Sequence, residues 1–489
     1  MTDASLPAVF ERFAEARERR LGWEQLWRDC YAYALPMRGH GLSHGAFAGN
    51  NHAERLFDGT APDAVEQLAA SLLAELTPPW ARWFGLRPGH DVEDADRHEL
   101  AEILDSAASR VQGHFDRSNF SVEIHQCFLD LVTTGTATLL FEEAPVGCTS
   151  AFRFTAIPAA EIYLDGDGNG VIERHFRVTT ATLSGIRRRF ANCQQLAGIS
   201  DPHPAASEVK LELLEYVSAR GSYFDYQAIL PVQGDTVRSP VVLAEGIFEH
   251  PPFLTFRWMK GTGELYGRSP VMTALPDIKT ANKVVELVLK NASIAATGIW
   301  LAEDDGVLNP ANIRLVPGSI IPKAAGSAGL TPLQAPGRFD VSELVLSDLR
   351  SRIRHTLLAD RLAQMNDRRM TATEVLERSA EMTRLLGAIY GRLQAELLNP
   401  LMQRALAILR RRGEVPAVAL DGTIADVHHR SPLARVQARE EIRNTLLWLE
   451  TVGKLGGDAG HYVNLAAAAS WLADTLGVPR ELVISPSED

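Results

Sequence analysis

Apolar residues recur at helical spacing through much of the chain, and one such stretch with a well-marked start runs from 261 to 300. Ser269 suits the N-cap of a helix and Pro270 its first turn, whereas Pro276 predicts a kink or an end soon afterwards. Beyond this proline the apolar positions are three or four residues apart, at Ile278, Ala281, Val285, Val288, Ala292 and Ala295. This spacing predicts an amphipathic helix with a narrow apolar seam.

The same pattern predicts helices on both sides of a β-rich region. Four N-terminal helices are expected over 7–35, 62–76, 93–117 and 120–134. Alternating apolar residues and glycine turns predict strands from Thr136 to Arg177 and from Tyr216 to Trp258, with a helix over 179–200 between them. The chain is therefore expected to be α+β and mainly α.

Helix-start signals also mark the C-terminal half of the chain. Asp340 and Thr371 each precede a glutamate by three residues, which predicts two capped helices. The second is expected to kink at Asn399-Pro400 and to stop at Gly413. A helical tail follows over 431–476, and its alanine-rich run at 466–469 is expected to be buried.

Composition narrows the class of protein. The chain has 489 residues, 46% of them hydrophobic, so it can bury a sizeable core in two to four domain-sized units. A net charge of −12 argues against a protein that holds nucleic acid by bulk charge, but not against one past which DNA slides. The cysteines are scattered, which predicts reduced thiols, and no apolar run is long enough to span a membrane.

Three stretches imitate ligand-binding motifs and fail on spacing. Asp165–Gly170 matches the start of a calcium loop, but Phe176 stands where a bidentate glutamate is needed, so a hairpin turn is favoured. Gly261–Ser269 has neither the spacing nor the lysine of a P-loop, and misses the dinucleotide fingerprint. The histidine-containing loop over 37–53 has no acid or cysteine at metal spacing. No cofactor and no metal are expected.

Several stretches together resemble a known family. They are LPMRG, FDGTAPDAVEQLAASLLAELTPPWARWF, GELYGRSPVMTALPDIKTAN, and MTATEVLERSAEM followed by LLNPLMQRALAIL. These motifs, and their order across nearly the whole chain, resemble those of the portal proteins, or head-to-tail connectors, of short-tailed bacteriophages (podoviruses). The resemblance implies a structural protein rather than an enzyme. It implies a ring, usually a dodecamer, assembled in the host cytoplasm and placed at one capsid vertex of the virion.

The resemblance also implies partners and a division of the chain. Double-stranded DNA would pass through the ring, which would dock the terminase large subunit and later the tail adaptor protein, and contact the major capsid and scaffolding proteins. The implied regions are an α+β wing over 1–260, a first stem helix region over 261–298, a β clip over 299–338, a second stem helix over 339–363, a tunnel loop over 364–370, a long kinked wing helix over 371–413 and a helical crown over 414–489.

Site residues follow from this division as expectations. The DNA-facing tunnel loop would present Gln364, Asn366, Asp367, Arg368 and Arg369. The stem would line the channel or join subunits through Lys279, Lys283, Glu286, Lys290, Arg350 and Arg354. The clip would dock partners through Glu303, Asp304, Asp305 and Arg314.

The roles of the stem lysines and the class of protein each leave alternatives. The lysines would form either basic belts around DNA or inter-subunit salt bridges. A DNA-handling enzyme, such as a packaging ATPase or nuclease, is one alternative function, although the sequence shows neither a Walker motif nor a carboxylate cluster on strand ends. Another head-completion or tail protein of the virion is the second alternative.

Overall fold

The structure is a computed structural model. The fold consists of α-helices and antiparallel β-sheets. The structure describes residues 5–37, 56–92, 94–194, 196, 199, 210–233, 237–297, 300–302, 330–332, 339–362, 387, 389–416, 422–429, 432–455 and 463–476. Four N-terminal helices confirm the ranges predicted from periodicity: α1 (Leu6–Ala34), α2 (Thr60–Leu76), α3 (Asp94–Asp116) and α4 (Phe120–Thr134). The largest apolar cluster gathers residues of α2, α4 and the sheet that follows, among them Leu68, Phe128 and Phe141.

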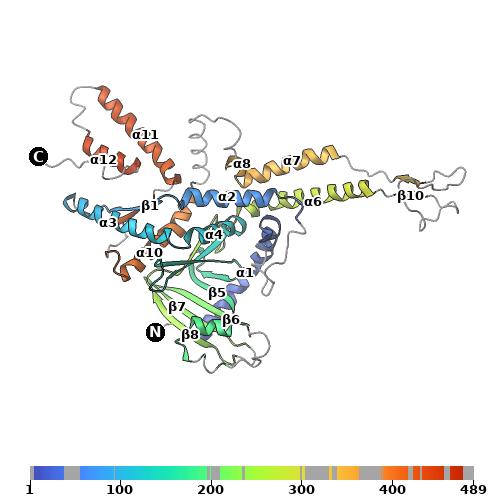
Figure 1. Ribbon diagram of the computed structural model, residues 1–489, viewed down its shortest axis with the longest axis horizontal. Helices are drawn as coiled ribbons and strands as arrows, with labels where there is room; N and C mark the ends of the chain where they lie inside the picture. The colour runs from blue at the N-terminus through green and yellow to red at the C-terminus, as the bar shows by residue number, and fades with distance from the viewer. Residues whose placement is uncertain are drawn as a thin grey trace.

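A five-stranded antiparallel sheet forms one end of the body (Figure 1). Its strands, in spatial order, are β4 (Ile162–Gly166), β5 (Ile172–Thr182), β6 (Lys210–Arg220), β7 (Tyr223–Leu230) and β8 (Val241–Phe248). Alternation along β6 covers both faces: Leu214 and Tyr216 lie in a cluster with Val9 of α1, whereas Leu211 and Leu213 cluster with α5 (Leu183–Arg189).

Two smaller sheets connect distant parts of the chain. The strand β2 (Thr136–Glu143) lies between β3 (Phe152–Ile157) and β9 (Phe253–Arg257). The strand β1 (Phe84–Pro88) pairs with β12 (Ala425–His429), so the chain returns to the body after its long helix.

The helix predicted over 179–200 is wrong in its extent. The strand β5 continues to Thr182, which pairs with Lys210 of β6, and α5 ends at Arg189. The β-branched residues Thr179, Thr180 and Thr182 favour a strand, and nine residue pairs with β6 outweigh the helical pattern.

Two long helices project side by side from the body (Figure 1). They are α6 (Pro270–Thr297) and α7 (Phe339–Thr356), with the short strands β10 (Trp300–Ala302) and β11 (Leu330–Pro332) beyond their far end. At the body end, Leu358 adopts a φ of 59° and breaks the helix before α8 (Ala359–Leu362). The helix α7 therefore ends at Thr356, and the chain continues as α8 to Leu362.

The C-terminal part consists of helices. A π-helical turn, η5 (Gln394–Leu398), leads without a break into α10 (Asn399–Arg411), and Gly413 follows with a φ of +72°. Two further helices, α11 (Pro432–Leu455) and α12 (Leu465–Leu476), stand apart from the sheets (Figure 1). The prediction that the alanine run is buried is wrong, because Ala466, Ala467 and Ala469 are exposed in the single chain.

Candidate channel stem and its junction with the body

The first stem helix, α6, starts from a cap that also fixes it to the body. The Ser269 hydroxyl accepts a hydrogen bond from the backbone N–H of Met272 (2.9 Å) and donates one to the Thr133 carbonyl at the end of α4 (2.8 Å). Ser269 is buried, so both bonds lie out of water. This confirms the predicted N-cap and shows that the cap orients the helix as well.

Pro276 does not end α6, so of the two outcomes predicted from the sequence, a kink or an end, the end is wrong. It lies inside one continuous helix from Pro270 to Thr297. Its missing N–H removes one hydrogen bond, but Ile278 and Ala281, just beyond it, are fully packed into the core. The hydroxyl of Thr280 also bonds to the Pro276 carbonyl (2.8 Å). Packing of the apolar seam therefore outweighs the helix-breaking tendency of the proline.

The apolar seam accounts for only part of the apolar surface of the stem. Near the body, Leu349 and Ile353 of α7 are buried. Farther out, Leu287 and Leu289 of α6 remain 49% and 52% exposed, and Leu344 of α7 is 74% exposed. Residues two apart on a helix point about 200° from each other, so α6 presents apolar side chains in nearly opposite directions. A stem with two apolar sides is typical of a subunit with a neighbour on each side.

The stem lysines are each paired with a carboxylate of their own chain. Lys279 binds Asp29 of α1 (2.6 Å). Lys283 and Lys290 both bind Glu286, at 3.0 and 2.6 Å. Hydrogen bonds from the two lysines lower the pKa of Glu286, which keeps it ionised. The spacing of one helical turn brings these residues together, and the belt of charge that each copy could offer is largely neutralised.

The predicted stem residue Arg350, on α7, is paired with Asp58 in the segment before α2, and α6 bonds to the same segment. Its Nε donates to Asp58 Oδ2 (2.8 Å) just before α2. Asn282 of α6 accepts bonds from the backbone N–H groups of Phe57 and Asp58, at 2.6 and 3.1 Å. Burial raises the pKa of Asp58, but hydrogen bonds from Thr60 and Arg350 outweigh it and lower the pKa below its ordinary value. Arg354, by contrast, is exposed on α7.

Sequence reasoning missed a buried arginine at the root of the stem. Arg257, at the end of β9, is only 5% exposed and binds Glu396 of the π-helical turn, with Nη2 to Oε1 at 2.7 Å. Its backbone N–H also donates to Glu396 Oε2 (2.9 Å). Its Nη1 donates to the carbonyls of Gly170 (2.9 Å) and Leu265 (3.2 Å). One side chain thus joins the sheet, the long helix and the loop that leads into α6.

The glycine-rich loop before α6 is a packing feature, in agreement with the rejection of a phosphate-binding motif. A Cβ on Gly267 would lie 2.1 Å from the carbonyl oxygen of Gly135, so the two backbones meet too closely for a side chain. Tyr266 is buried between Trp23 and Trp27 of α1, and its hydroxyl accepts a bond from the backbone N–H of Leu164 (3.0 Å). The loop is therefore held in place on both sides.

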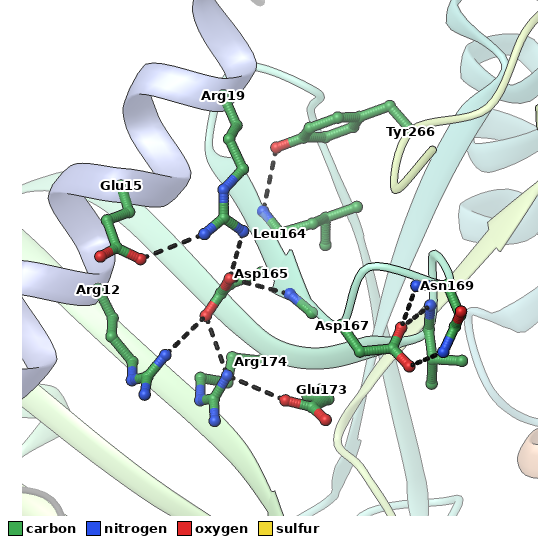
Figure 2. A network of polar contacts seen from close by, with 12 residues as sticks. Arg12, Glu15, Arg19, Leu164, Asp165, Asp167, Asn169, Glu173, Arg174 and Tyr266 are labelled. Atoms are coloured by element: carbon green, nitrogen blue, oxygen red, sulfur yellow. Dashed lines mark hydrogen bonds and ion pairs between the residues drawn. The ribbon is translucent and has the colours of Figure 1, made fainter. Parts of the chain in front are cut away.

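Figure 2 shows the polar network beside this loop. Asp165 is buried and accepts ion pairs from Arg19 (2.5 Å), Arg174 (3.1 Å) and Arg12 (3.9 Å). The next acidic residue, Asp167, accepts bonds from the backbone N–H groups at 169 and 171. This geometry confirms a hairpin turn for the stretch that imitates a calcium loop, and it locks α1 onto the sheet.

The remaining predicted site residues lie outside the described residues. They are Gln364, Asn366, Asp367, Arg368 and Arg369 of the expected tunnel loop, and Glu303, Asp304, Asp305 and Arg314 of the expected clip. Within the described ranges, no three His, Cys, Asp or Glu side chains are grouped as metal ligands would be. Nor does any described helix have the length and hydropathy to cross a membrane.

Comparison with known proteins places this architecture in a family. The family model described as "Bacteriophage head to tail connecting protein" matches residues 7–484. A "Probable portal protein" of Bordetella phage BPP-1 is 24% identical, over 97% of this chain and 88% of the relative. The portal protein of Salmonella phage epsilon15 is 23% identical, over 99% of this chain and 90% of the relative. That of Escherichia phage T7 is 22% identical, over 98% and 88%.

Among solved structures, one chain from the neck of an empty gene transfer agent particle aligns with a TM-score of 0.39 and 11% identity. The alignment covers 89% of this chain and 95% of that chain. The sequence relatives confirm the resemblance drawn from the motifs, and the family model spans nearly all of the residues. The chain therefore belongs to the family of bacteriophage head-to-tail connecting proteins, and the relatives named above are portal proteins.

Proposed function

We propose that copies of this chain form a closed ring at one capsid vertex, and that double-stranded DNA passes through the ring during packaging and ejection. The observation that carries the proposal is the projecting pair α6 and α7, with apolar residues on two sides of α6. Single apolar residues on a surface are ordinary, but Leu287 and Leu289 point in nearly opposite directions on a helix that extends away from the core. Neighbouring copies on both sides cover them in a ring.

The regions of the chain divide the work as the family resemblance implies. The sheets and N-terminal helices, over 1–260, form the wing, and α6 and α7 form the stem. The segment over 299–338 is the clip, which docks the terminase large subunit and then the tail adaptor. The segment over 364–370 is the tunnel loop, 371–413 is the long wing helix, and 414–489 is the crown. The outer wing faces the capsid and scaffolding proteins.

The charge of the stem suits a channel through which DNA moves. Phosphate binding needs free cations, and its strength falls with salt as counterions are exchanged. Lys283 and Lys290 share one carboxylate in the same chain, so the stem offers DNA little net attraction. In an acidic chain, this pairing of lysines with a carboxylate lets DNA slide through the channel rather than bind to its wall.

The first test of this proposal is imaging of the purified protein by negative-stain electron microscopy. We expect class averages viewed down the axis to show a ring with about twelvefold symmetry and a central channel wide enough for a duplex. The control is the same protein with Leu287 and Leu289 both changed to Lys, which should shift it toward smaller species because charge replaces apolar contact. A pure chain that stays monomeric and hydrolyses ATP in a DNA-dependent way would overturn the proposal.

A second test addresses the tunnel loop. Replacing both Arg368 and Arg369 with Ala should leave rings intact and impair packaging or retention of DNA in particles. Packaged DNA is measured by nuclease protection, and Arg411 with Arg412, which pair with Glu143 in the wing, provide a control doublet. Normal packaging and retention in the loop variant would remove the assignment of 364–370 to the channel.

A further inference from the structure

The helix α11 carries three consecutive exposed apolar residues in an otherwise polar stretch. Leu446, Leu447 and Trp448 are 49%, 61% and 48% exposed. An exposed tryptophan beside two exposed leucines is unusual on a stable surface, because large apolar patches mark sites of association.

Helical geometry places these three residues on three different sides of α11. Successive residues turn by about 100°, so Leu446 and Trp448 point about 200° apart and Leu447 lies between them. The side of the helix that faces the rest of the chain carries Ile442, which is buried, and Leu449, which is half-buried. Leu446 and Trp448 therefore occupy the two opposite flanks of α11, and Leu447 points outward.

The outward side of α11 carries charged residues that are exposed to solvent. It carries Glu450 and Lys454, which pair with each other at 2.5 Å and are both mostly exposed. Leu447 is the apolar exception on that side and is the most exposed of the three. Among the described residues, each flank therefore presents one large apolar side chain, whereas the outward side presents Leu447 beside an ion pair.

The neighbouring helix α12 has the same character. Its sequence, LAAAASWLADTL, contains one charged residue, and Leu465 is 70% exposed. A helix that is apolar on nearly all sides is stable in water only when it is covered. Figure 1 shows that α11 and α12 stand away from the sheets, and the part of the body that α11 contacts is α2.

We propose that each flank of the α11–α12 pair packs against the same pair of an adjacent copy, with the Leu446 flank of one copy against the Trp448 flank of the next. This inference rests on the proposed ring. One globular partner on one side would leave the other flank exposed, whereas a ring supplies a neighbour on both. The two flanks differ in size and shape, as a heterologous contact requires. The stem shows the same two-sided pattern at Leu287 and Leu289, so the contact continues along the subunit.

The proposal distinguishes three adjacent substitutions. Leu446→Lys and Trp448→Lys should each raise, by tenfold or more, the protein concentration at which half of the rings dissociate in native mass spectrometry. The matched control Leu447→Lys should change that concentration by less than twofold, since its side chain stays in water. Equal effects at all three positions would overturn the flank geometry.

Crosslinking gives a test that leaves the apolar residues in place. Asn444 lies near the Trp448 flank and Glu450 near the Leu446 flank, and both are exposed. In a Cys148→Ser background, rings with both Asn444→Cys and Glu450→Cys should give a ladder of covalent oligomers with a short bismaleimide. Each single-cysteine variant should stay monomeric on a denaturing gel.

The outcomes separate this inference from the proposed function. Rings in the microscope with a covalent ladder support both. Rings without a ladder overturn the crown contact and leave the ring in place, and so does a ladder from either single variant, because it would mean like flanks meet. A chain that forms no rings overturns the proposed function and the crown contact with it.

Discussion

The buried pair of Arg257 and Glu396 gives the sharpest prediction about stability. Replacing Glu396 with Leu leaves the Arg257 guanidinium, which is 5% exposed, without a carboxylate. Breaking a buried ion pair by removing one partner costs about 3–5 kcal/mol. The backbone N–H of Arg257, which also donates to Glu396, loses its acceptor as well. Replacing Arg257 with Met should cost a similar amount, since Glu396 and the Leu265 carbonyl lose their donor, while the Gly170 carbonyl keeps the bond from Lys260.

The double variant should lose less free energy of unfolding than the sum of the losses in the two single variants. With both charges gone, the remaining defect is chiefly the Leu265 carbonyl without a donor and the backbone N–H of residue 257 without its acceptor, at about 1–3 kcal/mol. The coupling energy of the pair is then about 3 kcal/mol or more, well outside the range for independent sites. The wild type and three variants are compared by urea unfolding at one protein concentration, with their assembly state matched by sedimentation.

A nearby exposed pair provides the control for this cycle. Arg268 and Glu264 lie in the same loop, and Arg268 is 60% exposed, so Arg268→Met should cost less than about 1 kcal/mol. Hydrogen exchange over 261–269 should also quicken in Arg257→Met and not in Arg268→Met, because Arg257 holds the Leu265 carbonyl. Additive losses in the double variant would refute the claim that one buried arginine joins the sheet, the long helix and the stem.

Three further predictions concern the wing and the root of the stem. Asp165→Asn should lower the free energy of unfolding by about 2–4 kcal/mol because three arginines lose their shared carboxylate, whereas Asp167→Asn, which keeps the turn, should be nearly neutral. Gly267→Ala should cost about 2 kcal/mol or more because its Cβ would meet the Gly135 carbonyl, and Gly246→Ala, with open space around it, is the control; both are read by thermal unfolding. Burial lowers the pKa of His175 from 6.5 to about 4. The unfolded chain takes up a proton below 6.5 that the folded chain refuses, so stability is full above pH 6.5 and should fall by about 3 kcal/mol on acidification to pH 4. A His175→Phe variant should flatten that dependence, and the exposed His90→Gln should not.

Local patterns predicted those features that depend on neighbouring residues. The spacing of apolar positions located the N-terminal helices, and Ser269 marked the start of α6, because caps and seams are encoded within a few residues. The same reasoning was wrong about a helix end at Pro276 and about the extent of the helix over 179–200. There, burial of Ile278 and pairing of β5 with β6, which involve distant residues, outweigh local preference.

The polar junctions could not be found from local patterns. Arg257 and Glu396 are 139 residues apart in the chain, and Arg19 and Asp165 are 146 apart. Each residue alone looks like an ordinary surface charge, and only the fold brings the partners together and removes them from water. The family resemblance supplied the function, because it depends on the order of motifs rather than on contacts.

Glu286 sets the net charge that Lys283 and Lys290 present on the stem. It binds Lys283 and Lys290 at once, and both lysines are otherwise mostly exposed. Glu286→Gln removes the carboxylate charge and leaves two cations per copy. If these side chains line the channel, purified rings should bind duplex DNA more tightly at low salt. The affinity should also fall more steeply with salt, because each phosphate contact adds about −0.9 to the logarithmic slope.

The matched control is Glu450→Gln on α11, which frees Lys454 from a pair of the same helical spacing outside the stem. Binding is followed by fluorescence anisotropy at several salt concentrations, with ring integrity checked in each. A steeper slope for Glu286→Gln alone means that carboxylates of the same chain keep the channel from holding DNA. An unchanged slope means that Lys283 and Lys290 face neighbouring copies, so their pairing with Glu286 serves assembly and not transport.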